Sequence, residues 1–131
     1  INRDYLAKAV FNNPKALKTL NALVHPAVGV DYRHWQEEQT SDYTIKEAAL
    51  MFESGSYKGL DYVINVSAPE EIRIQRVLNR DSFRDQNEVE AIIDKQLSED
   101  ERIKRSDFVV VNDGNEMIIP QLLKLHERFS E

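Results

Sequence analysis

The sequence predicts an α/β protein in which a parallel sheet is flanked by helices, and two observations carry this prediction. Short runs rich in β-branched and aromatic residues alternate along the chain with amphipathic stretches long enough for helices. Strands that alternate with helices are typical of βαβ units, whose strands lie parallel in one sheet. At 131 residues the chain has the length of one compact domain.

Residues 1–42 are predicted to be helical. Asn12-Asn13 interrupts a first helical pattern, and Pro14 suits the first turn of a second helix. Because proline lacks an amide hydrogen, His25-Pro26 is predicted to break or kink that helix. A further helix with Val28, Tyr32 and Trp35 would follow. The apolar residues at helical spacing are Tyr5, Leu6, Ala9 and Val10 in the first helix, and Leu17, Leu20, Leu23 and Val24 in the second.

Three segments are predicted to be strands, and they are Tyr43–Ala49, Tyr62–Ser67 and Phe108–Val111. The first leads into a turn at Glu53-Ser54-Gly55, and the third into a turn at Asp113-Gly114. A parallel sheet of three strands is thin and leaves an edge exposed. We therefore expect that earlier strands are missing and that the chain forms a homo-oligomer through the exposed edge.

The segment between the second and third strands is predicted to hold three helices, and a closing helix is predicted over Met117–Phe129. A proline followed by two glutamates suits the positive end of the first helix, and a serine suits the cap of the third. The first helix is expected from Pro69 to Arg80, and a loop over 81–85 follows it. The second would be capped by Asn87 and end at Leu97, and the third would be a short helix capped by Ser98.

Composition and charge exclude several classes of function. The formal net charge of -6 disfavours nucleic acid as a partner, because nucleic-acid binding needs a basic surface. The chain has no cysteine and hence no thiolate metal ligand, which fits a reducing cytoplasm. No apolar run suggests a membrane span or a signal peptide. The histidines at 25, 34 and 126 lack metal-site spacing, and Ser54 lacks the pattern of a catalytic nucleophile.

Arg73, Arg76 and Arg80 recur at positions that share one helix face, and Arg84 follows in the next loop. In an acidic protein such a cluster is a candidate phosphate site, because a guanidinium donates several hydrogen bonds in one plane and stays charged. The alternative is a solvated face paired with acids, and the residues alone favour it. The acids available for such pairs are Asp81, Asp85, Glu88 and Glu99.

Polar residues also stand near the ends of the predicted strands. Glu47 and Glu53 bracket the end of the first one, and in open α/β sheets ligands gather at the carboxyl ends of strands. A carboxylate there either orients a substrate or Mg²⁺ or merely belongs to a turn. Asn112-Asp113-Gly114 is either an ordinary turn or a backbone loop against a purine ring. His25 is expected on a mostly buried helix face as a structural hydrogen-bonding group.

Five segments, in their order and spacing, resemble the dephospho-coenzyme A kinase family. No single segment is specific, but together they extend over nearly the whole chain. They are Leu23-Val24-His25-Pro26, Leu50-Met51-Phe52-Glu53-Ser54-Gly55, Asn79-Arg80-Asp81, Gln96 with Arg102 and Asp107, and Val111-Asn112-Asp113-Gly114.

The resemblance implies a partial P-loop kinase fold with three regions. Residues 1–42 would form a helical region for the acceptor substrate, residues 43–80 and 106–131 an incomplete α/β core, and residues 81–105 a helical lid. The implied reaction uses ATP, with Mg²⁺, to phosphorylate the ribose 3′-hydroxyl of dephospho-CoA, giving coenzyme A and ADP. Such a transfer depends mainly on positioning and charge neutralisation.

The resemblance also assigns residues to ligands. Arg80 and Arg102 would meet the ATP phosphates when the lid closes, and Asn112 and Gly114 would lie near the adenine. The residues expected at the dephospho-CoA site are His25, Glu47 and Glu53.

The sequence departs from the family pattern in two respects. Ala49 stands where the family usually has proline, which loosens a turn but removes no chemical group. No GxxxxGKS or GxxxxGKT phosphate loop occurs, and the aspartate expected to act as base has no counterpart. Because the first residue is Ile1 rather than methionine and the phosphate loop is absent, we expect truncation upstream. Without that loop and the base, the chain alone is expected to be catalytically inactive or nearly so.

The sequence leaves two other functions open. A different nucleoside or nucleotide kinase would need more acceptor-binding arginines in the first helices than Arg3 and Arg33. A non-catalytic binding or interaction module without a phosphate loop is the alternative from another class.

Overall fold

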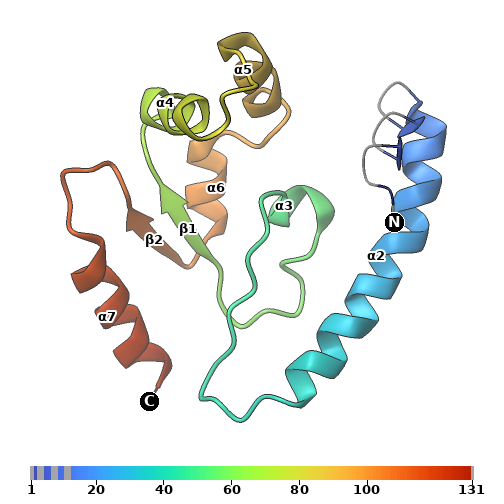
Figure 1. Cartoon of the computed structure of the whole chain (residues 1–131). Helices are drawn as coiled ribbons and strands as arrows, with labels where there is room; N and C mark the ends of the chain where they lie inside the picture. The colour runs from blue at the N-terminus through green and yellow to red at the C-terminus, as the bar shows by residue number, and fades with distance from the viewer. Residues whose placement is uncertain (1, 3–4, 7–8, 11–12, 131) are drawn as a thin grey trace. The chain divides into compact units, whose positions relative to one another are not determined.

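The computed structural model describes residues 2, 5–6, 9–10 and 13–130 (Figure 1). The chain divides into two units, Ile1–Thr44 and Ile45–Glu131, and each is described by itself. In the first unit, residues 5–6 and 9–10 are helical, and the rest of the first predicted helix lies outside the described residues.

Helix α2 (Pro14–Glu37) is the main element of the first unit. Asn13 caps it, since its side-chain oxygen accepts a hydrogen bond from the amide of Ala16 at 3.0 Å, and Pro14 occupies its first turn as predicted. The predicted break at Pro26 is wrong, because the helix continues through that residue and absorbs the segment expected as a separate helix. A proline inside a helix removes one backbone hydrogen bond, and the bonds on both sides carry α2 across the gap.

The second unit is built on a parallel pair of strands, β1 (Ile64–Ser67) and β2 (Phe108–Val111). Their register pairs Ile64 with Phe108 and Ser67 with Val111. Since both strands run in the same direction, their carboxyl ends meet at one edge of the sheet (Figure 1). The predicted strands at these two positions are confirmed, and the α/β class with them.

The third predicted strand, Tyr43–Ala49, is wrong. Residues 43–48 form no strand within the described part of the chain, and a short helix, α3 (Met51–Ser54), follows them. A strand needs a neighbour that completes its hydrogen-bond ladder, and its own β-branched residues do not supply one. Gly55, at φ 72°, ends α3 in a conformation that glycine adopts without strain.

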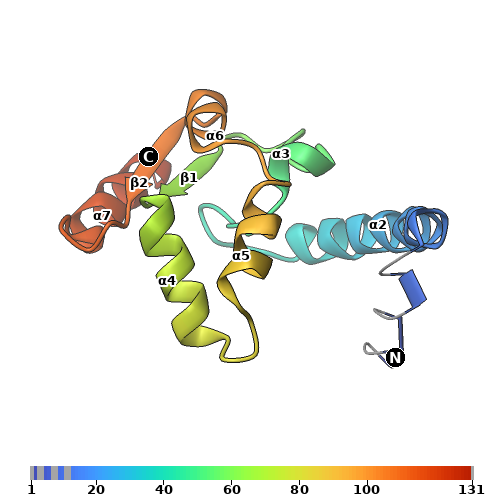
Figure 2. The same ribbon diagram turned by 90° about the horizontal axis from the view of Figure 1, so that it is seen from above.

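Three helices connect β1 to β2, namely α4 (Glu70–Arg80), α5 (Gln86–Ile93) and α6 (Glu99–Arg105). Helices α4 and α5 pack against each other, and α6 contacts β1 (Figure 2). The predicted limits of α4 and the Ser98 cap of α6 are confirmed, since the Ser98 hydroxyl accepts from the amide of Glu101 at 3.3 Å.

The predicted cap and end of α5 are wrong. Asp85, not Asn87, is the cap, and the helix ends at Ile93 rather than Leu97. Asp85 and Glu88 form a capping box, in which each side chain accepts a hydrogen bond from the other's backbone amide. This reciprocal pair satisfies two otherwise unpaired donors, an advantage that Asn87 inside the helix does not offer.

Helix α7 (Ile118–Phe129) closes the unit and packs on β2. Phe129 joins Tyr62 and Phe108 in an aromatic cluster with ring centroids 5.4–5.5 Å apart. The side-chain amide of Gln121 pairs with both backbone groups of Val111, accepting at 2.8 Å and donating at 3.0 Å. Among the described residues, the buried apolar side chains are Ala68, Ile74, Val89 and Val110.

Candidate functional site

Two adjoining pockets lie in the second unit among helices α4, α5 and α6 and the segments that join them. The first, called here the α6 pocket, has a volume of about 270 Å³. The second, the α4–α5 pocket, has a volume of about 440 Å³. Arg73, Ile93 and Gln96 line both, so the two pockets form one concave region. The arginines that line it are Arg73 and Arg102 in the α6 pocket, and Arg73, Arg76, Arg80 and Arg84 in the α4–α5 pocket.

Arg102 is an enclosed member of the predicted ligand-binding set, with 16% of its side chain exposed. Its Nη1 donates to the carbonyl oxygen of Leu97 at 2.9 Å and to the side chain of Gln96 at 3.5 Å. Its Nη2 donates to the carboxylate of Glu99. These contacts hold the guanidinium at the wall of the α6 pocket, where Gln96, Leu97 and Glu99 also lie.

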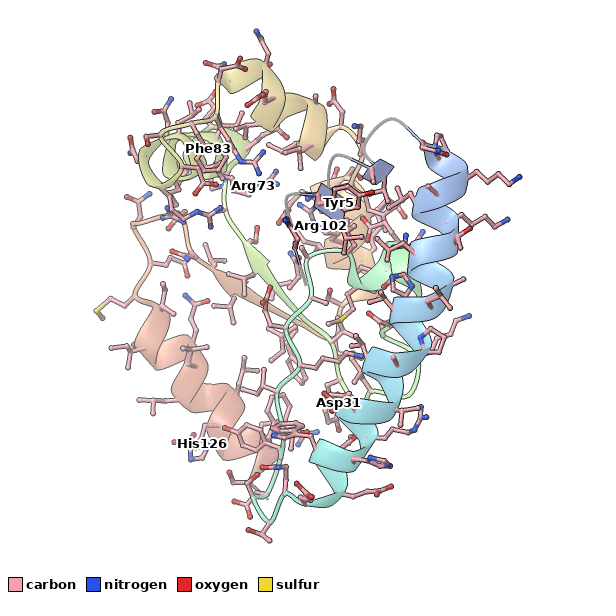
Figure 3. All side chains as sticks on the ribbon, turned by 45° about the vertical axis from the view of Figure 1, so that its right-hand side comes forward. Tyr5, Asp31, Arg73, Phe83, Arg102 and His126 are labelled. Carbon is pink, nitrogen blue, oxygen red and sulfur yellow. The ribbon has the colours of Figure 1, made fainter. Side chains whose placement is uncertain are left out.

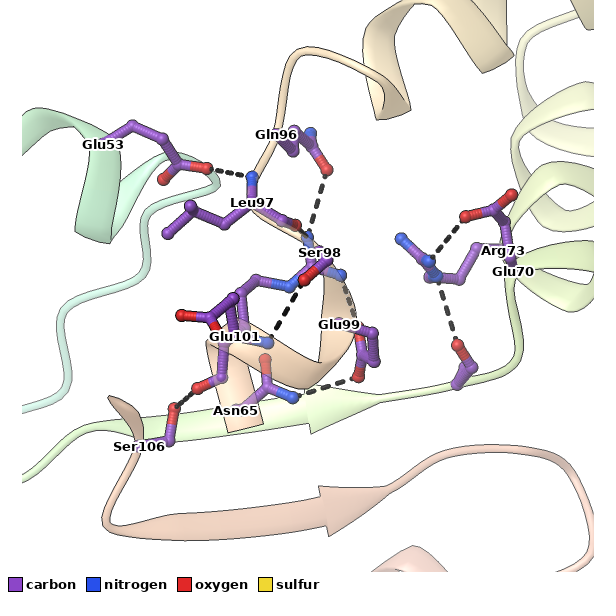
Figure 4. Close-up of polar contacts among 12 residues, drawn as sticks. Glu53, Asn65, Glu70, Arg73, Gln96, Leu97, Ser98, Glu99, Glu101 and Ser106 are labelled. Atoms are coloured by element: carbon purple, nitrogen blue, oxygen red, sulfur yellow. Dashed lines mark hydrogen bonds and ion pairs between the residues drawn. The ribbon is translucent and has the colours of Figure 1, made fainter. Parts of the chain in front are cut away.

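Glu99 connects this arginine to the sheet. Its Oε1 accepts a hydrogen bond from the side-chain amide of Asn65, on β1, at 3.1 Å (Figure 4). Desolvation raises the pKa of Glu99, but hydrogen bonds from Ser67, Arg102 and Asn65 together outweigh it, so that its pKa lies below the ordinary value. The carboxylate therefore stays charged inside the α6 pocket.

Arg73 and Arg76 attach helix α4 to the ends of both strands. The Nε of Arg73 donates to the carbonyl oxygen of Ala68 at 3.1 Å, and its Nη2 contacts Glu70 at 3.4 Å. Nη1 of Arg76 donates to the carbonyl oxygen of Asn112 at 2.8 Å, just beyond β2. The arginine face of α4 is thus fixed against the carboxyl edge of the sheet. Figure 3 labels Arg73 on α4 and Arg102 on α6, the two helices that supply arginines to the α6 pocket.

At the far end of α4, Asp81 contacts two arginines. It accepts from Nε and Nη2 of Arg80 at 2.9 and 3.0 Å, and it lies 3.4 Å from Nε of Arg84. The hydrogen bond from Arg80 is the main reason that the pKa of Asp81 lies below its ordinary value. Arg80 has a 74% exposed side chain and pairs with Asp81, which both the phosphate-site and the solvated-face interpretations allow. Asp85 and Glu88 do not pair with these arginines as the solvated-face interpretation expects, but form the α5 capping box.

Glu53 contacts the segment that leads into α6. Its Oε1 accepts a hydrogen bond from the backbone amide of Leu97 at 2.9 Å (Figure 4). This bond is the main cause that lowers the pKa of Glu53, and the positive charges of Arg102 and Arg105 add to it. Because Arg102 binds the Leu97 carbonyl, the backbone of Leu97 is held on both sides.

The other predicted site residues lie outside the lining of the two pockets. Glu47 is exposed, and His25 is exposed on α2 in the first unit, so the expectation of a buried His25 is wrong. Asn112 extends the ladder of β2, since its amide donates to the Ser67 carbonyl at 2.7 Å. Gly114 has φ 91°, and Asp113 accepts from two backbone amides in the same turn.

Sequence reasoning named Gln96 and Glu99 but overlooked the other groups that hold Arg102 and its partners. Asn65 and the backbone of Leu97 carry no sequence signal, because their role depends on the packing of α6 against β1 and of Glu53 against Leu97. Glu99 had a signal, since it stands three residues before Arg102 at the start of a capped helix, where such pairs face each other.

Metal binding and membrane insertion find no support in the described residues. Within them, no group of histidine and acidic side chains is arranged to hold a metal ion. None of their helices is both long and apolar enough to cross a membrane.

The parallel strands and the helices between them define an α/β protein, and the arginines of α4 bind backbone carbonyls just beyond the carboxyl ends of both strands. The profile of the family described as dephospho-CoA kinase matches residues 1–117. The chain belongs to the dephospho-CoA kinase family.

Individual relatives agree with this assignment. The dephospho-CoA kinase of Fusobacterium nucleatum is 37% identical over 131 residues, which are 100% of this chain and 66% of the relative. The crystal structure of TT1252 from Thermus thermophilus matches 97% of this chain and 66% of its own, with a TM-score of 0.87 and 32% identity. The structure of dephospho-CoA kinase from Campylobacter jejuni matches 99% of this chain and 66% of its own chain, with a TM-score of 0.65 and 29% identity. The chain thus spans just under two thirds of the length of these relatives.

Proposed function

We propose that the protein acts in the dephospho-CoA kinase reaction, in which the γ-phosphoryl group of ATP passes to the ribose 3′-hydroxyl of dephospho-CoA. The products are coenzyme A and ADP, and the proposed location is the cytoplasm. The observation that carries the proposal is the enclosed Arg102 beside Arg73 in a pocket at the carboxyl edge of the sheet. Phosphoryl transfer needs positive charge placed around the phosphates rather than covalent help from the protein.

Arg102 and Arg80 are proposed to bind the ATP phosphates in different ways. Arg102 is held by backbone and side-chain acceptors, so its guanidinium is already oriented before a ligand arrives. Arg80 is exposed and pairs with Asp81 at the helix end, and in this proposal it leaves that pair and turns toward a phosphate when the lid closes. Arg73, between the two, would add a further positive charge.

Asn112 and Gly114 are proposed to border the adenine. The bond from Arg76 to the Asn112 carbonyl joins this loop to the arginine face of α4. Gly114, at φ 91°, has no side chain, so a flat ring can lie over the backbone of the loop.

For the acceptor, His25, Glu47 and Glu53 are proposed to contact dephospho-CoA. The exposed side chains of His25 and Glu47 leave their polar atoms accessible to a ligand. Glu53 has one oxygen on the Leu97 amide, so it would also connect the acceptor to the segment that carries Arg102.

Mg²⁺ is assigned no residue in this proposal. The described acidic and histidine side chains form no metal-binding group, so no step is routed through a metal held by this chain. The sequence has no GxxxxGKS or GxxxxGKT segment, whose backbone amides and lysine would hold the phosphates. We therefore propose that this chain binds phosphate groups but does not transfer them alone.

Calorimetric titration with metal-free inorganic triphosphate tests the phosphate site. Arg102→Ala should weaken binding about tenfold, because a charge-assisted contact is lost. Arg105→Ala is the matched control, since Arg105 lies on the same helix and pairs with Glu101 outside both pockets, and it should change affinity less than about twofold. Equal weakening by the two variants would show only a general charge effect and would contradict the proposal.

A further inference from the structure

Arg102 donates three of its five N–H groups to protein acceptors. Both of its terminal nitrogens already donate to protein acceptors, Nη1 to Leu97 and Gln96 and Nη2 to Glu99. A phosphate that binds this guanidinium through two nitrogens uses Nη2 on either edge, so it competes with the acceptor already on Nη2. The acceptor on Nη2 differs from the other two because it carries a full negative charge, as a phosphate oxygen does.

Glu99 lies in the α6 pocket as a built-in anion. It lines the pocket together with Arg73 and Arg102, and 24% of its side chain is exposed. Asn65 holds its second oxygen from the sheet at 3.1 Å. The carboxylate is thus fixed from one side by β1 and bound to the arginine on the other.

The neighbouring acids do not occupy an equivalent place. Glu70 contacts Arg73 at 3.4 Å but is 58% exposed, and Glu53 binds the Leu97 amide rather than an arginine. Among the hydrogen bonds and ion pairs of the described residues, Glu99 is the acid that contacts Arg102 directly.

We propose that Glu99 holds Arg102 in the ligand-free chain and competes with the nucleotide phosphate for it, so that Glu99 sets the affinity of the phosphate site. The proposal rests on the phosphate-binding role of Arg102 given above. Glu99 is then a positioning residue that acts through Arg102. Its negative charge lowers the affinity of the pocket for any anion. Only a ligand with several phosphate charges displaces the Glu99 carboxylate from Arg102.

The test compares two charge-neutralising variants on the same helix. Glu99→Gln keeps an oxygen that can accept from Asn65 but removes the negative charge. Glu101→Gln removes the same charge from a residue that pairs with Lys104 and Arg105 and lies outside both pockets. Calorimetry with metal-free inorganic triphosphate should show binding about fivefold tighter for Glu99→Gln and changed less than twofold for Glu101→Gln.

A double-variant cycle shows whether the gain passes through Arg102. In an Arg102→Ala background, Glu99→Gln should give no more gain than Glu101→Gln, because there is no arginine to release. An equal gain with and without Arg102 would overturn the proposal, and so would unchanged or weaker binding by Glu99→Gln. Absence of triphosphate binding by every protein, including the unmodified chain, would overturn both this proposal and the phosphate site itself.

A measurement on the unmodified chain covers the case in which Glu99→Gln fails to fold. Carbon NMR of the glutamate carboxyl groups during triphosphate titration should show a shift of the Glu99 signal as its contact with Arg102 is replaced. The Glu101 signal should stay in place. Saturation with triphosphate while the Glu99 signal is unchanged would overturn the proposal.

Discussion

At the scale of single residues, the site depends on how protein acceptors orient charged donors. Arg102 is oriented by Leu97, Gln96 and Glu99, and Leu97 is in turn held by Glu53. A residue outside the phosphate site can therefore change phosphate affinity, because it fixes the backbone from which the arginine is held.

The first prediction concerns Glu53. Glu53→Ala removes the acceptor of the Leu97 amide, so the segment before α6 loosens and triphosphate affinity falls about threefold to tenfold. Glu53→Gln keeps an amide oxygen for the same hydrogen bond and should lose less than about twofold. Calorimetry of the unmodified chain and the two variants measures triphosphate affinity. Equal losses of affinity in the two variants would show that the charge of Glu53, rather than its hydrogen bond, is responsible.

A second prediction follows from the lowered pKa values of Glu53, Asp81 and Glu99. A carboxyl whose pKa is lower in the folded state stabilises the fold above its ordinary pKa, and this stabilisation is lost as the pH falls through the folded value. The free energy of unfolding should therefore decline below the ordinary values of 4.5 for glutamate and 3.8 for aspartate. Urea unfolding as a function of pH measures this decline, which should be shallower in Glu99→Gln; parallel curves would contradict the assignment.

At the scale of elements, the sequence predicted those helices and strands that local patterns determine. Strands β1 and β2 and helix α4 carry compact β-branched runs or a proline-and-acid start, and all three were correct. The strand over Tyr43–Ala49 was not predictable in this way, because a strand requires a partner elsewhere in the chain. The break at Pro26 failed because the rest of a long helix tolerates the loss of one hydrogen bond.

The same division applies to the candidate site. The arginine face of α4 follows from helical periodicity, so Arg73, Arg76 and Arg80 were predictable as a group. The connection of Arg102 to the sheet through Glu99 was not predictable, because the hydrogen bond between Asn65 and Glu99 joins residues 34 positions apart in the sequence. Contacts at such separation depend on tertiary packing, which composition and spacing do not report.

The capping box of α5 gives a prediction for this helix. Asp85→Ala should lower the free energy of unfolding by about 1 kcal/mol, because the amide of Glu88 loses its acceptor at 2.9 Å. Asp85→Asn should cost much less, since asparagine caps helices about as well. Urea unfolding of both variants measures the difference, and an equal cost would show that the negative charge of Asp85 matters more than its cap.

At the scale of the whole molecule, the second unit exposes large apolar side chains on its surface. Val66 on β1 is 61% exposed, and Met117 and Ile119 near the start of α7 are 76% and 71% exposed. Such surface favours association with other protein surfaces.

We predict that the chain self-associates in a concentration-dependent way, and that Val66→Lys reduces this association by placing a charge on the exposed strand. Sedimentation velocity over a range of concentrations measures the effect. A chain that stays monomeric at high concentration would contradict the prediction.

We also predict that the chain forms no coenzyme A when incubated with dephospho-CoA, ATP and Mg²⁺, because its sequence lacks a phosphate loop. Chromatographic detection of coenzyme A is the measurement. Steady formation of the product by the purified chain would show that another part of it replaces that loop.

The central claim is that arginines of α4 and α6 form a phosphate site at the carboxyl edge of the sheet, and NMR mapping of triphosphate binding on backbone amides tests it most directly. The chain carries a net charge of -6, so an anion is repelled from most of its surface and should bind only where arginines cluster. The account predicts shifts at Arg73 and at residues 96–102, with α7 unchanged. Shifts on α7 with none at residues 96–102 would contradict it.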